Sequence, residues 1–518
     1  MPEPDSVRRV RFRCSRLGDE GPASFRGELN SLDTSAVPWQ TEVIMSSSGS
    51  FPCSSVISVA DCVPKAAPET SPARVSPTVE RACSSTAAAP RRVLLSNIAW
   101  MLVGNVAYGF SQWALLVALA KIGTIEMVGN FALAIAIVLP VLMFGSLSLR
   151  SIQITDYNGL YRFLEYVSLR LLSLVLSLFF ILGFGLIAGY SRAVLLSTLL
   201  IAGAKAFEYI SDLLYGLLQQ REDMVGVAIS MALRATFSVA ALSLGVFVTH
   251  SLVWGSAGLL LASAAVLFGY DIPKTFADRK SRLSSVIRES IAYFRSLVTH
   301  RGDRRLWKLA LTGLPMGLVL MLVSLNLNIP RYFIQRHLGM AELGIFSAIA
   351  TLLAAGGVVT NAVGQAAAPR LAKYFLTGNK RGFRSLLTTI VAASLGLGTL
   401  GFAGALFFGR PAMALIYRPE YSTRQDVLVW LMGASGLFYL GSTLGYAVTA
   451  VRCFAPQLPL FSAAAVTTGI GCFALVPRLG LRGAAMAILI SAVVQCFGSA
   501  YLLRKSCRQA ATELPIRF

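Results

Sequence analysis

From residue 93 onward the chain alternates between long apolar stretches and short polar connections. A helix needs about 20 apolar residues to cross about 30 Å of hydrocarbon, and each stretch reaches that length. Lipid offers the backbone no hydrogen-bonding partner, so the stretches are expected to be helices. Twelve of them run approximately over 94–120, 127–149, 167–189, 193–219, 224–248, 252–271, 308–329, 342–367, 386–408, 426–450, 457–476 and 481–503. The pattern predicts an all-α, polytopic membrane protein.

The composition supports this prediction. Apolar residues make up 55% of the chain and charged residues 14%, whereas soluble domains carry about 25% charged residues. The net charge is +21, but residues 1–92 hold 11 Lys/Arg against 10 Asp/Glu, and the excess lies in 93–518 with 35 against 15. Basic residues spread among apolar segments are typical of loops beside a membrane, so no nucleic-acid partner is expected.

The distribution of Lys and Arg predicts the orientation. With the N-terminus in the cytoplasm, inner connections and the C-terminal tail hold 24 basic residues after residue 92, and outer connections hold 9. This bias favours cytoplasmic termini. Ten basic residues lie in 273–308, midway along the twelve stretches. The predicted domains are a first lobe of six helices (93–272), a linker (273–307), a second lobe of six helices (308–505) and a cytoplasmic tail (506–518).

Two segments outside the spans have their own patterns. Residues 1–92 are rich in Ser, Pro, Ala and Arg and have no long apolar run, which predicts a disordered extension. The alternative is a later translation start, at Met45 or near Met101. In the linker, apolar residues recur at helical spacing among arginines, which predicts an amphipathic helix in the cytoplasmic interface. A simple basic stop that fixes topology is the competing interpretation.

Four charged residues lie well inside predicted spans, away from their ends: Lys205, Glu208 and Asp212 in the fourth, and Arg234 in the fifth. Each costs about 2.5–3.5 kcal/mol near the bilayer centre, so such groups face the bundle interior or a water-filled cavity. The first three share one helix face, and Lys205 and Arg234 come to similar depth and could meet. In one interpretation the two cations attract an anionic cargo, and the two acids hold the cations when the cavity is empty or take up a coupling proton. In the other, all four form a permanent ion-pair cluster that joins the two spans.

Further polar residues within or beside the spans are candidates to line a cavity and to hydrogen-bond a polar cargo, with helix packing as the alternative for each. They are Gln112, Asn326, Asn328, Arg331, Asn361 and Gln365. Eight cysteines and three histidines are scattered without metal-ligand spacing, and there is no phosphate-binding GxxxxGK[ST] loop. No cofactor and no metal are expected.

The two halves share a sequence pattern. The segments 112–131 and 328–346 each carry an amide residue eleven positions before a glycine, followed by a glutamate, a glycine and a phenylalanine at similar spacing. The register of the last two differs by one residue. Repeated six-helix bundles are a common way to build a transporter whose site lies at their interface.

The chain resembles the oligosaccharide flippases of bacterial polysaccharide and O-antigen export, which share a superfamily with multidrug/toxin extrusion carriers and lipid II flippases. The resemblance covers about residues 93–505. The residues that show the resemblance are Asn97–Trp100, Gly129–Pro140, Arg150 and Asp156, Asn328–Phe333, Leu338–Gly339, Glu342–Phe346 and Pro369–Arg370. It implies two six-helix lobes around a central cavity that opens alternately to either side of the bacterial inner membrane. The implied cargo is a polyprenyl-pyrophosphate-linked oligosaccharide, and the implied partners are membrane lipid and other polysaccharide-export proteins.

Three other functions are compatible with parts of the sequence pattern. A lipid II flippase differs mainly in headgroup and stays open. A cation-coupled multidrug exporter would be expected to carry an acidic residue in its first span, but 94–120 has none. A membrane glycan polymerase or glycosyltransferase would present acids or bases on a large outer loop, whereas the outer connections here are short. We therefore expect a transporter and no enzyme; the glycan and the energy source are not predicted.

Overall fold

The computed structural model describes residues 77–513 except for 157–158, 277–303 and 452–455. Over these ranges the chain is helical and has no strand, so the predicted all-α fold is confirmed. The predicted disorder of residues 1–76, nearly all of the predicted linker helix and residues 514–518 lie outside the described residues.

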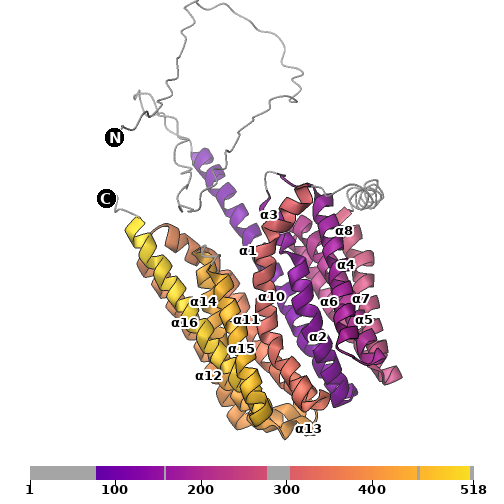
Figure 1. Cartoon of the computed structure of the whole chain (residues 1–518). Helices are drawn as coiled ribbons and strands as arrows, with labels where there is room; N and C mark the ends of the chain where they lie inside the picture. The colour runs from indigo at the N-terminus through magenta and orange to yellow at the C-terminus, as the bar shows by residue number, and fades with distance from the viewer. Residues whose placement is uncertain (1–76, 157–158, 277–303, 452–455, 514–518) are drawn as a thin grey trace, which may run out of the picture. The chain divides into compact units, whose positions relative to one another are not determined.

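The helices fall into two sequential groups (Figure 1). The N-terminal group consists of α1(Pro77–Ile122), α2(Ile125–Ser146), α3(Leu149–Thr155), α4(Phe163–Ile187), α5(Arg192–Gln220), α6(Met224–Thr249), α7(Leu252–Val266), the π-helix η2(Leu267–Asp271) and α8(Ile272–Phe276). The C-terminal group consists of α10(Arg304–Leu338), α11(Met340–Leu376), α12(Lys380–Ile416), α13(Pro419–Ser422), α14(Gln425–Ala450), α15(Gln457–Leu479) and α16(Leu481–Glu513).

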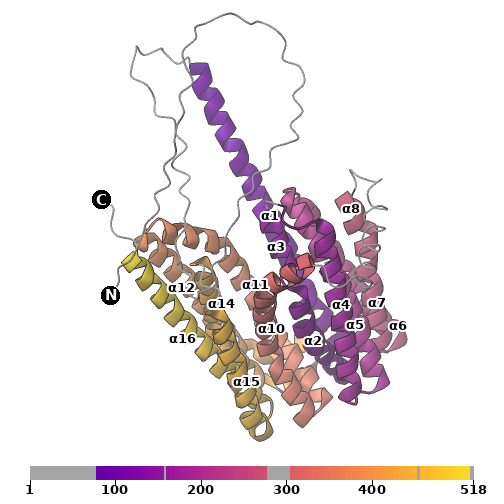
Figure 2. The same cartoon turned by 45° about the horizontal axis from the view of Figure 1, so that its top comes forward.

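Twelve helices among the described residues are long and apolar enough to span a membrane, which confirms the predicted number. Several helices are longer than their apolar stretches. Helix α1 begins at Pro77, so residues 77–92 are helical where we expected disorder, and its first turns project from the bundle (Figure 2). Arg170 and Arg331, which lie near the ends of predicted stretches, are inside helices α4 and α10. Apolar length limits the part of a helix in lipid, whereas backbone hydrogen bonding decides where the helix ends.

Polar residues at the turns set the beginnings of several spans. In each case a side-chain oxygen accepts a hydrogen bond from the backbone N–H three residues later, which satisfies a donor that the first helical turn leaves free. The capping residues are Thr124 for α2, Ser191 for α5, Asp223 for α6 and Asn379 for α12. The short polar connections of the sequence therefore act as helix starts.

Helix α2 joins the two groups: it packs against α4 and α5 on one side and against α10 and α11 on the other. Gly129 of α2 and Gly344 of α11 lie at the closest approach. A Cβ atom on Gly129 would lie 2.0 Å from the Met340 carbonyl oxygen, and one on Gly344 would lie 2.2 Å from the Ile125 carbonyl oxygen. These glycines belong to the two duplicated segments, so the repeated pattern includes a close backbone contact between the two helix groups.

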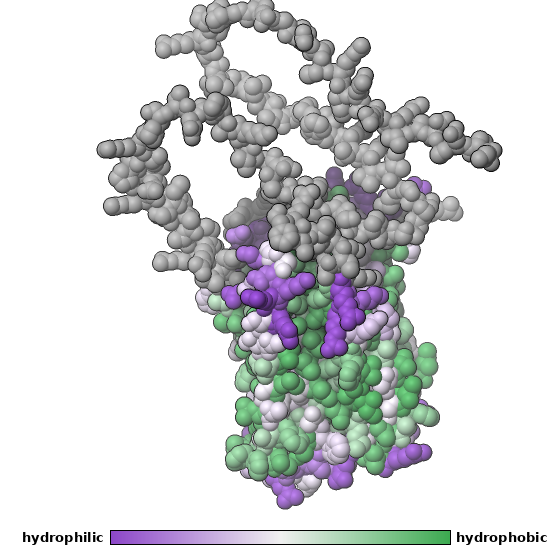
Figure 3. All heavy atoms as spheres, turned by 90° about the vertical axis from the view of Figure 1, so that its left-hand side faces the viewer, coloured by the Kyte–Doolittle hydropathy of each residue, from purple (hydrophilic) through white to green (hydrophobic). Residues whose placement is uncertain are grey.

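The surface of the helical region has the polarity expected of a membrane protein. Large apolar side chains such as Phe407 and Phe497 are about three-quarters exposed, at 74% and 75%. A broad apolar band separates hydrophilic residues at the two ends in the space-filling view (Figure 3). Lipid tails, which replace water around such a band, remove the cost of exposing these side chains. The chain is a multi-pass membrane protein.

Candidate functional site

Ionised groups gather in the interior of the N-terminal group. Five charged residues of the described chain are buried, and all five belong to helices α4 to η2; they are Glu165, Arg170, Lys205, Arg234 and Asp271. The corresponding buried polar residues of α10 to α16 are neutral. A buried charge requires a partner or a hydrated neighbourhood. The buried charges therefore place the candidate site among the helices of the N-terminal group.

Lys205 lies midway along α5 in a cluster with Glu208, Tyr108 and Gln112, which we call the lysine cluster. Its ammonium nitrogen lies 3.0 and 3.1 Å from the two carboxylate oxygens of Glu208, 3.1 Å from Gln112 Oε1 and 3.2 Å from Tyr108 Oη. The Tyr108 hydroxyl donates to Glu208 Oε2 at 2.7 Å. The cluster ties α1 to α5 at mid-depth and has no net charge.

A second set of polar residues lies toward the C-terminal end of α5, which we call the arginine cluster: Arg150, Gln153, Arg170, Asp212 and Gln219. Arg150 donates to Asp212 Oδ1 at 2.9 Å and to Gln219 Oε1 at 3.1 Å. Arg170 Nη2 lies 3.8 Å from Asp212 Oδ2, which is beyond hydrogen-bonding distance. Two arginines thus share one carboxylate, and the cluster has an excess positive charge.

Arg170 and Gln153 carry unused hydrogen-bonding groups. The three guanidinium nitrogens of Arg170 and both side-chain polar atoms of Gln153 are buried with no hydrogen-bond partner among the described residues. Arg170 also lies over the ring of Tyr209. Leaving such groups unsatisfied costs about 1–3 kcal/mol each, and more for charged groups, which water or a ligand would recover. An arginine whose N–H groups have no hydrogen-bond partner can bind a phosphate or a carboxylate.

Arg234 forms a different arrangement from the one expected. Its Nη2 donates to Asp271 Oδ2 at 2.9 Å and to Ser211 Oγ at 2.6 Å, and Ser230 donates to the other oxygen of Asp271. Both charged side chains are nearly inaccessible, at 3% and 1%. Arg234 pairs neither with Glu208 nor with Asp212, so the ion pair we predicted has another acidic partner. This buried pair connects α5, α6 and η2.

The remaining predicted residues do not join the two clusters. Asn328 is buried on α10, donates to the Ser324 carbonyl and accepts from Arg331 Nη1 at 2.8 Å. Arg331 has no acidic partner within the described part of the chain. Gln365 is exposed on α11, as is Asn361 one turn earlier, which accepts from Ser442. Asn326 accepts from Thr468 and Ser491 and holds α10 to α15 and α16.

Sequence reasoning missed several members of these clusters. Asp271 is the last residue of the predicted sixth span, and Arg170 is the fourth residue of the predicted third stretch, so neither was singled out as a charge deep in a span. Arg150 directly follows the predicted second stretch. Their depths were readable from the chain, but their shared partner Asp212 was not.

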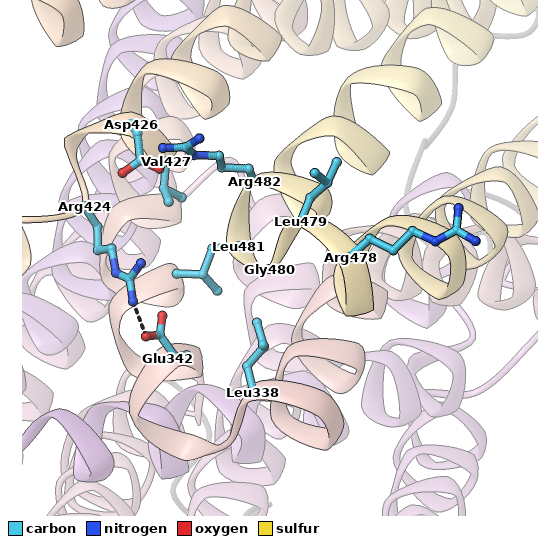
Figure 4. A pocket seen from close by; sticks show the side chains of 10 residues that line it. All are labelled: Leu338, Glu342, Arg424, Asp426, Val427, Arg478, Leu479, Gly480, Leu481 and Arg482. Atoms are coloured by element: carbon cyan, nitrogen blue, oxygen red, sulfur yellow. Dashed lines mark hydrogen bonds and ion pairs between the residues drawn. The ribbon is translucent and has the colours of Figure 1, made fainter.

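A pocket of about 430 Å³ lies at one end of the C-terminal group, at the ends of α10 and α15 and the starts of α11, α14 and α16 (Figure 4). Arg424 pairs with Glu342, and Arg482 donates to Asp426 at 2.6 Å. Arg478 points away from these pairs. In the nearby chain segment after α12, burial raises the pKa of Tyr421 to about 12, so this tyrosine stays neutral at physiological pH.

Within the described residues, no three His, Cys, Asp or Glu side chains are grouped to hold a metal ion. The charged clusters instead combine arginine, lysine, carboxylate and amide groups. Such sets bind anions and carbohydrate hydroxyls by hydrogen bonding and charge, without requiring a redox or Lewis-acid centre.

The comparisons with known proteins agree with this architecture. The inward-facing structure of a multidrug-resistance MATE transporter of the MOP superfamily matches with a TM-score of 0.60 and 14% identity, over 80% of this chain and 96% of that one. The inward closed structure of the lipid II flippase MurJ matches with a TM-score of 0.56 and 13% identity, over 81% and 90%. The chain thus has the fold of the transporters of the MOP superfamily.

A relative is also found by sequence. The capsular polysaccharide biosynthesis protein CapF of Staphylococcus aureus is 26% identical over 415 residues, which is 80% of this chain and the whole of that protein. No family model matches the chain.

Proposed function

We propose that this protein is a transporter that moves a polyprenyl-pyrophosphate-linked oligosaccharide across a bacterial inner membrane by alternating access, for the export of a polysaccharide. The observation that carries the proposal is the row of polar side chains along one face of α5. Lys205, Glu208, Asp212 and Gln219 recur at intervals of three, four and seven residues, and helices α1 and α3 add to the row through Gln112 and Arg150.

The physical task of a flippase explains such a row. The polyprenyl tail can remain in lipid while the headgroup crosses, so the protein needs only to replace the water around sugar and phosphate. Amide, carboxylate and phenol groups of the lysine cluster suit sugar hydroxyls. Arg150 and Arg170 suit the pyrophosphate, because a guanidinium can bind phosphate oxygens through two parallel hydrogen bonds.

We propose structural roles for two of the candidate residues. Arg234, expected to attract the phosphate, is neutralised by Asp271 and buried, so we assign it a structural role. Asn328 is likewise assigned to packing. Lys205, Glu208, Asp212 and Gln112 stay as proposed cargo contacts, together with Arg331 and Gln365 from the C-terminal group.

We further propose that α1–α8 and α10–α16 are the two lobes and that both termini are cytoplasmic. This orientation places the arginine cluster at the cytoplasmic end of the row, where a cytoplasmic headgroup would enter. It places the 430 Å³ pocket on the outer side of the C-terminal group. The names of the relatives support the class of cargo: CapF acts in capsular polysaccharide biosynthesis, and MurJ is a flippase for lipid II.

Reconstitution in liposomes tests the function. A fluorescent polyprenyl-pyrophosphate oligosaccharide placed in one leaflet should reach the other without any change in mass. Arg150→Ala should slow this movement about 10- to 100-fold, the loss expected for a charged hydrogen bond worth about 1.5–3 kcal/mol. Arg381→Ala, at an exposed arginine of α12, is the matched control and should leave the rate unchanged.

Other outcomes would select other functions. A product of new mass would indicate a polymerase or glycosyltransferase. Efflux of organic cations without glycan movement would indicate a drug exporter, and preference for lipid II over other lipid-linked glycans would indicate a peptidoglycan role. Any of these results would overturn the proposed export of a polysaccharide precursor.

A further inference from the structure

The lysine cluster surrounds one ammonium with more acceptors than it has protons. Four oxygen atoms, two from Glu208 and one each from Gln112 and Tyr108, lie within 3.0–3.2 Å of Lys205 Nζ. An ammonium has three N–H donors. Four oxygens around three donors form a shell for a compact positive charge, held by electrostatic attraction as much as by individual hydrogen bonds.

Two members of the shell, Tyr108 and Glu208, are bonded to each other independently of the lysine. Gln112 and Tyr108 come from α1 and Glu208 comes from α5, and the Tyr108 hydroxyl donates its proton to Glu208 Oε2. The lone pairs of the phenol oxygen are therefore free to face Lys205, and the carboxylate is fixed by a bond across the two helices. Deleting the ammonium would leave an oxygen-lined space with a net charge of −1.

The ligand chemistry is that of an alkali-metal site. Carboxylate, amide carbonyl and phenol oxygens are hard ligands, which suit hard cations. Small divalent ions need oxygens at about 2.0–2.6 Å, closer than the 3.0–3.2 Å found here. A large monovalent cation fits better. Two neighbouring arginines have ion-pair partners of their own, Arg234 with Asp271 and Arg150 with Asp212, although Arg234 also interacts electrostatically with Glu208.

We propose that Lys205 is a covalently tethered cation in a site built for a monovalent cation, and that this mid-membrane site therefore takes neither Na⁺ nor K⁺ from solution. Removal of the ammonium opens the site to a free monovalent ion, with K⁺ preferred. For the proposed transport, this inference means that no alkali-metal ion passes through this site. It rests on the geometry of the cluster and not on the identity of the cargo.

Thermal unfolding of the purified full-length protein in detergent tests the inference without any transport assay. The wild type, Lys205→Ala and the double variant Lys205→Ala/Glu208→Gln are melted in KCl, NaCl and choline chloride at the same ionic strength, about 150 mM. Lys205→Ala should melt below the wild type in choline and should gain about 2 °C or more in KCl, because an ion that binds only the folded state stabilises it. The wild type and the double variant should not distinguish the three salts.

Three results would overturn the inference: no cation-specific gain for Lys205→Ala, the same gain in the wild type, or the same gain in the double variant. If Lys205→Ala does not fold in any salt, folding of the double variant becomes the decisive measurement. The inference requires that the double variant recover folded protein by size exclusion, since its neutral shell needs no cation. A double variant as unstable as the single one would contradict it. Loss of glycan movement in liposomes with these salt effects intact would reject only the proposed function.

Discussion

The two helix groups keep their polar interiors in different ways. In α1–α8 the buried polar side chains include charged groups joined into the lysine cluster, the arginine cluster and the Arg234–Asp271 pair. In α10–α16 the buried polar side chains are hydroxyls and one amide, such as the Ser394–Thr443 pair at 2.7 Å. Ion pairs of the described C-terminal group lie at helix ends, as with Arg424 and Glu342.

The two helix groups differ in the energetic cost of their buried polar side chains. Buried charges are costly in lipid and are retained where a protein handles ions or polar cargo. Neutral hydroxyl pairs hold helices together at small energetic cost and impose no charge on the interior. The buried charges of the described chain therefore lie in the N-terminal group, whereas the C-terminal group contributes the half-buried Arg331 and the exposed Gln365.

The largest effect is expected at the buried ion pair of the N-terminal group. Arg234→Ala leaves Asp271 charged and unpaired, which should cost about 3–5 kcal/mol of stability and remove most of the folded protein. The combination Arg234→Met/Asp271→Leu should recover folded protein, because it removes both charges together. Fluorescence-detected size exclusion and Tm measure both variants. A single variant as stable as the wild type would contradict the structural role.

The next effect is expected at Arg170, where function and stability should separate. Since the guanidinium lacks hydrogen-bond partners, Arg170→Leu should leave Tm unchanged or raise it, while glycan movement in liposomes falls about 10-fold, equivalent to about 1.4 kcal/mol. Arg170→Lys, which keeps the charge but not the planar fork, should be intermediate. A fall in Tm together with transport would assign Arg170 to the fold instead.

A smaller effect is expected in the C-terminal group. Ser394→Ala removes one hydroxyl of a buried pair between α12 and α14, and hydrogen bonds of this kind contribute about 0.6 kcal/mol. Tm should drop slightly, and the transport rate should not change. A drop in transport as large as that of Arg170→Leu would show that both helix groups carry specific chemistry.

The smallest effect is expected at the 430 Å³ pocket of the C-terminal group. Arg424→Ala removes an exposed ion pair with Glu342, and such pairs contribute a few tenths of a kcal/mol. The Tm difference from wild type should be small and should vanish at high salt, because screening weakens exposed pairs. A large, salt-independent loss would mean that this pair is shielded in the membrane and belongs with the buried charges of the N-terminal group.

Sequence reasoning reached the fold more completely than the site. The number of spans and the helical class follow from hydropathy and length, and both are confirmed. The depth of Lys205 and Arg234 was also readable, because counting residues along a helix gives depth at 1.5 Å per residue. The two cations have different acidic partners: Lys205 pairs with Glu208 on its own helix, and Arg234 pairs with Asp271 at the end of the predicted sixth span.

Cross-helix partners required the tertiary structure. Tyr108 and Gln112 lie about a hundred positions from Lys205 in the chain, and neither has a spacing that connects it to α5. Arg150 and Arg170 come from α3 and α4 and converge on Asp212 of α5. No periodicity within one helix indicates which neighbour a side chain faces.

The sequence by itself determined that this chain crosses a membrane twelve times and carries charges in its first half, because a hydrocarbon solvent permits only helices of a given length and penalises every ionised group. Only the tertiary structure decided which charges cancel and which stay available. That outcome depends on how each helix is rotated about its axis and which helices pack beside it, and both depend on contacts between residues far apart in the chain.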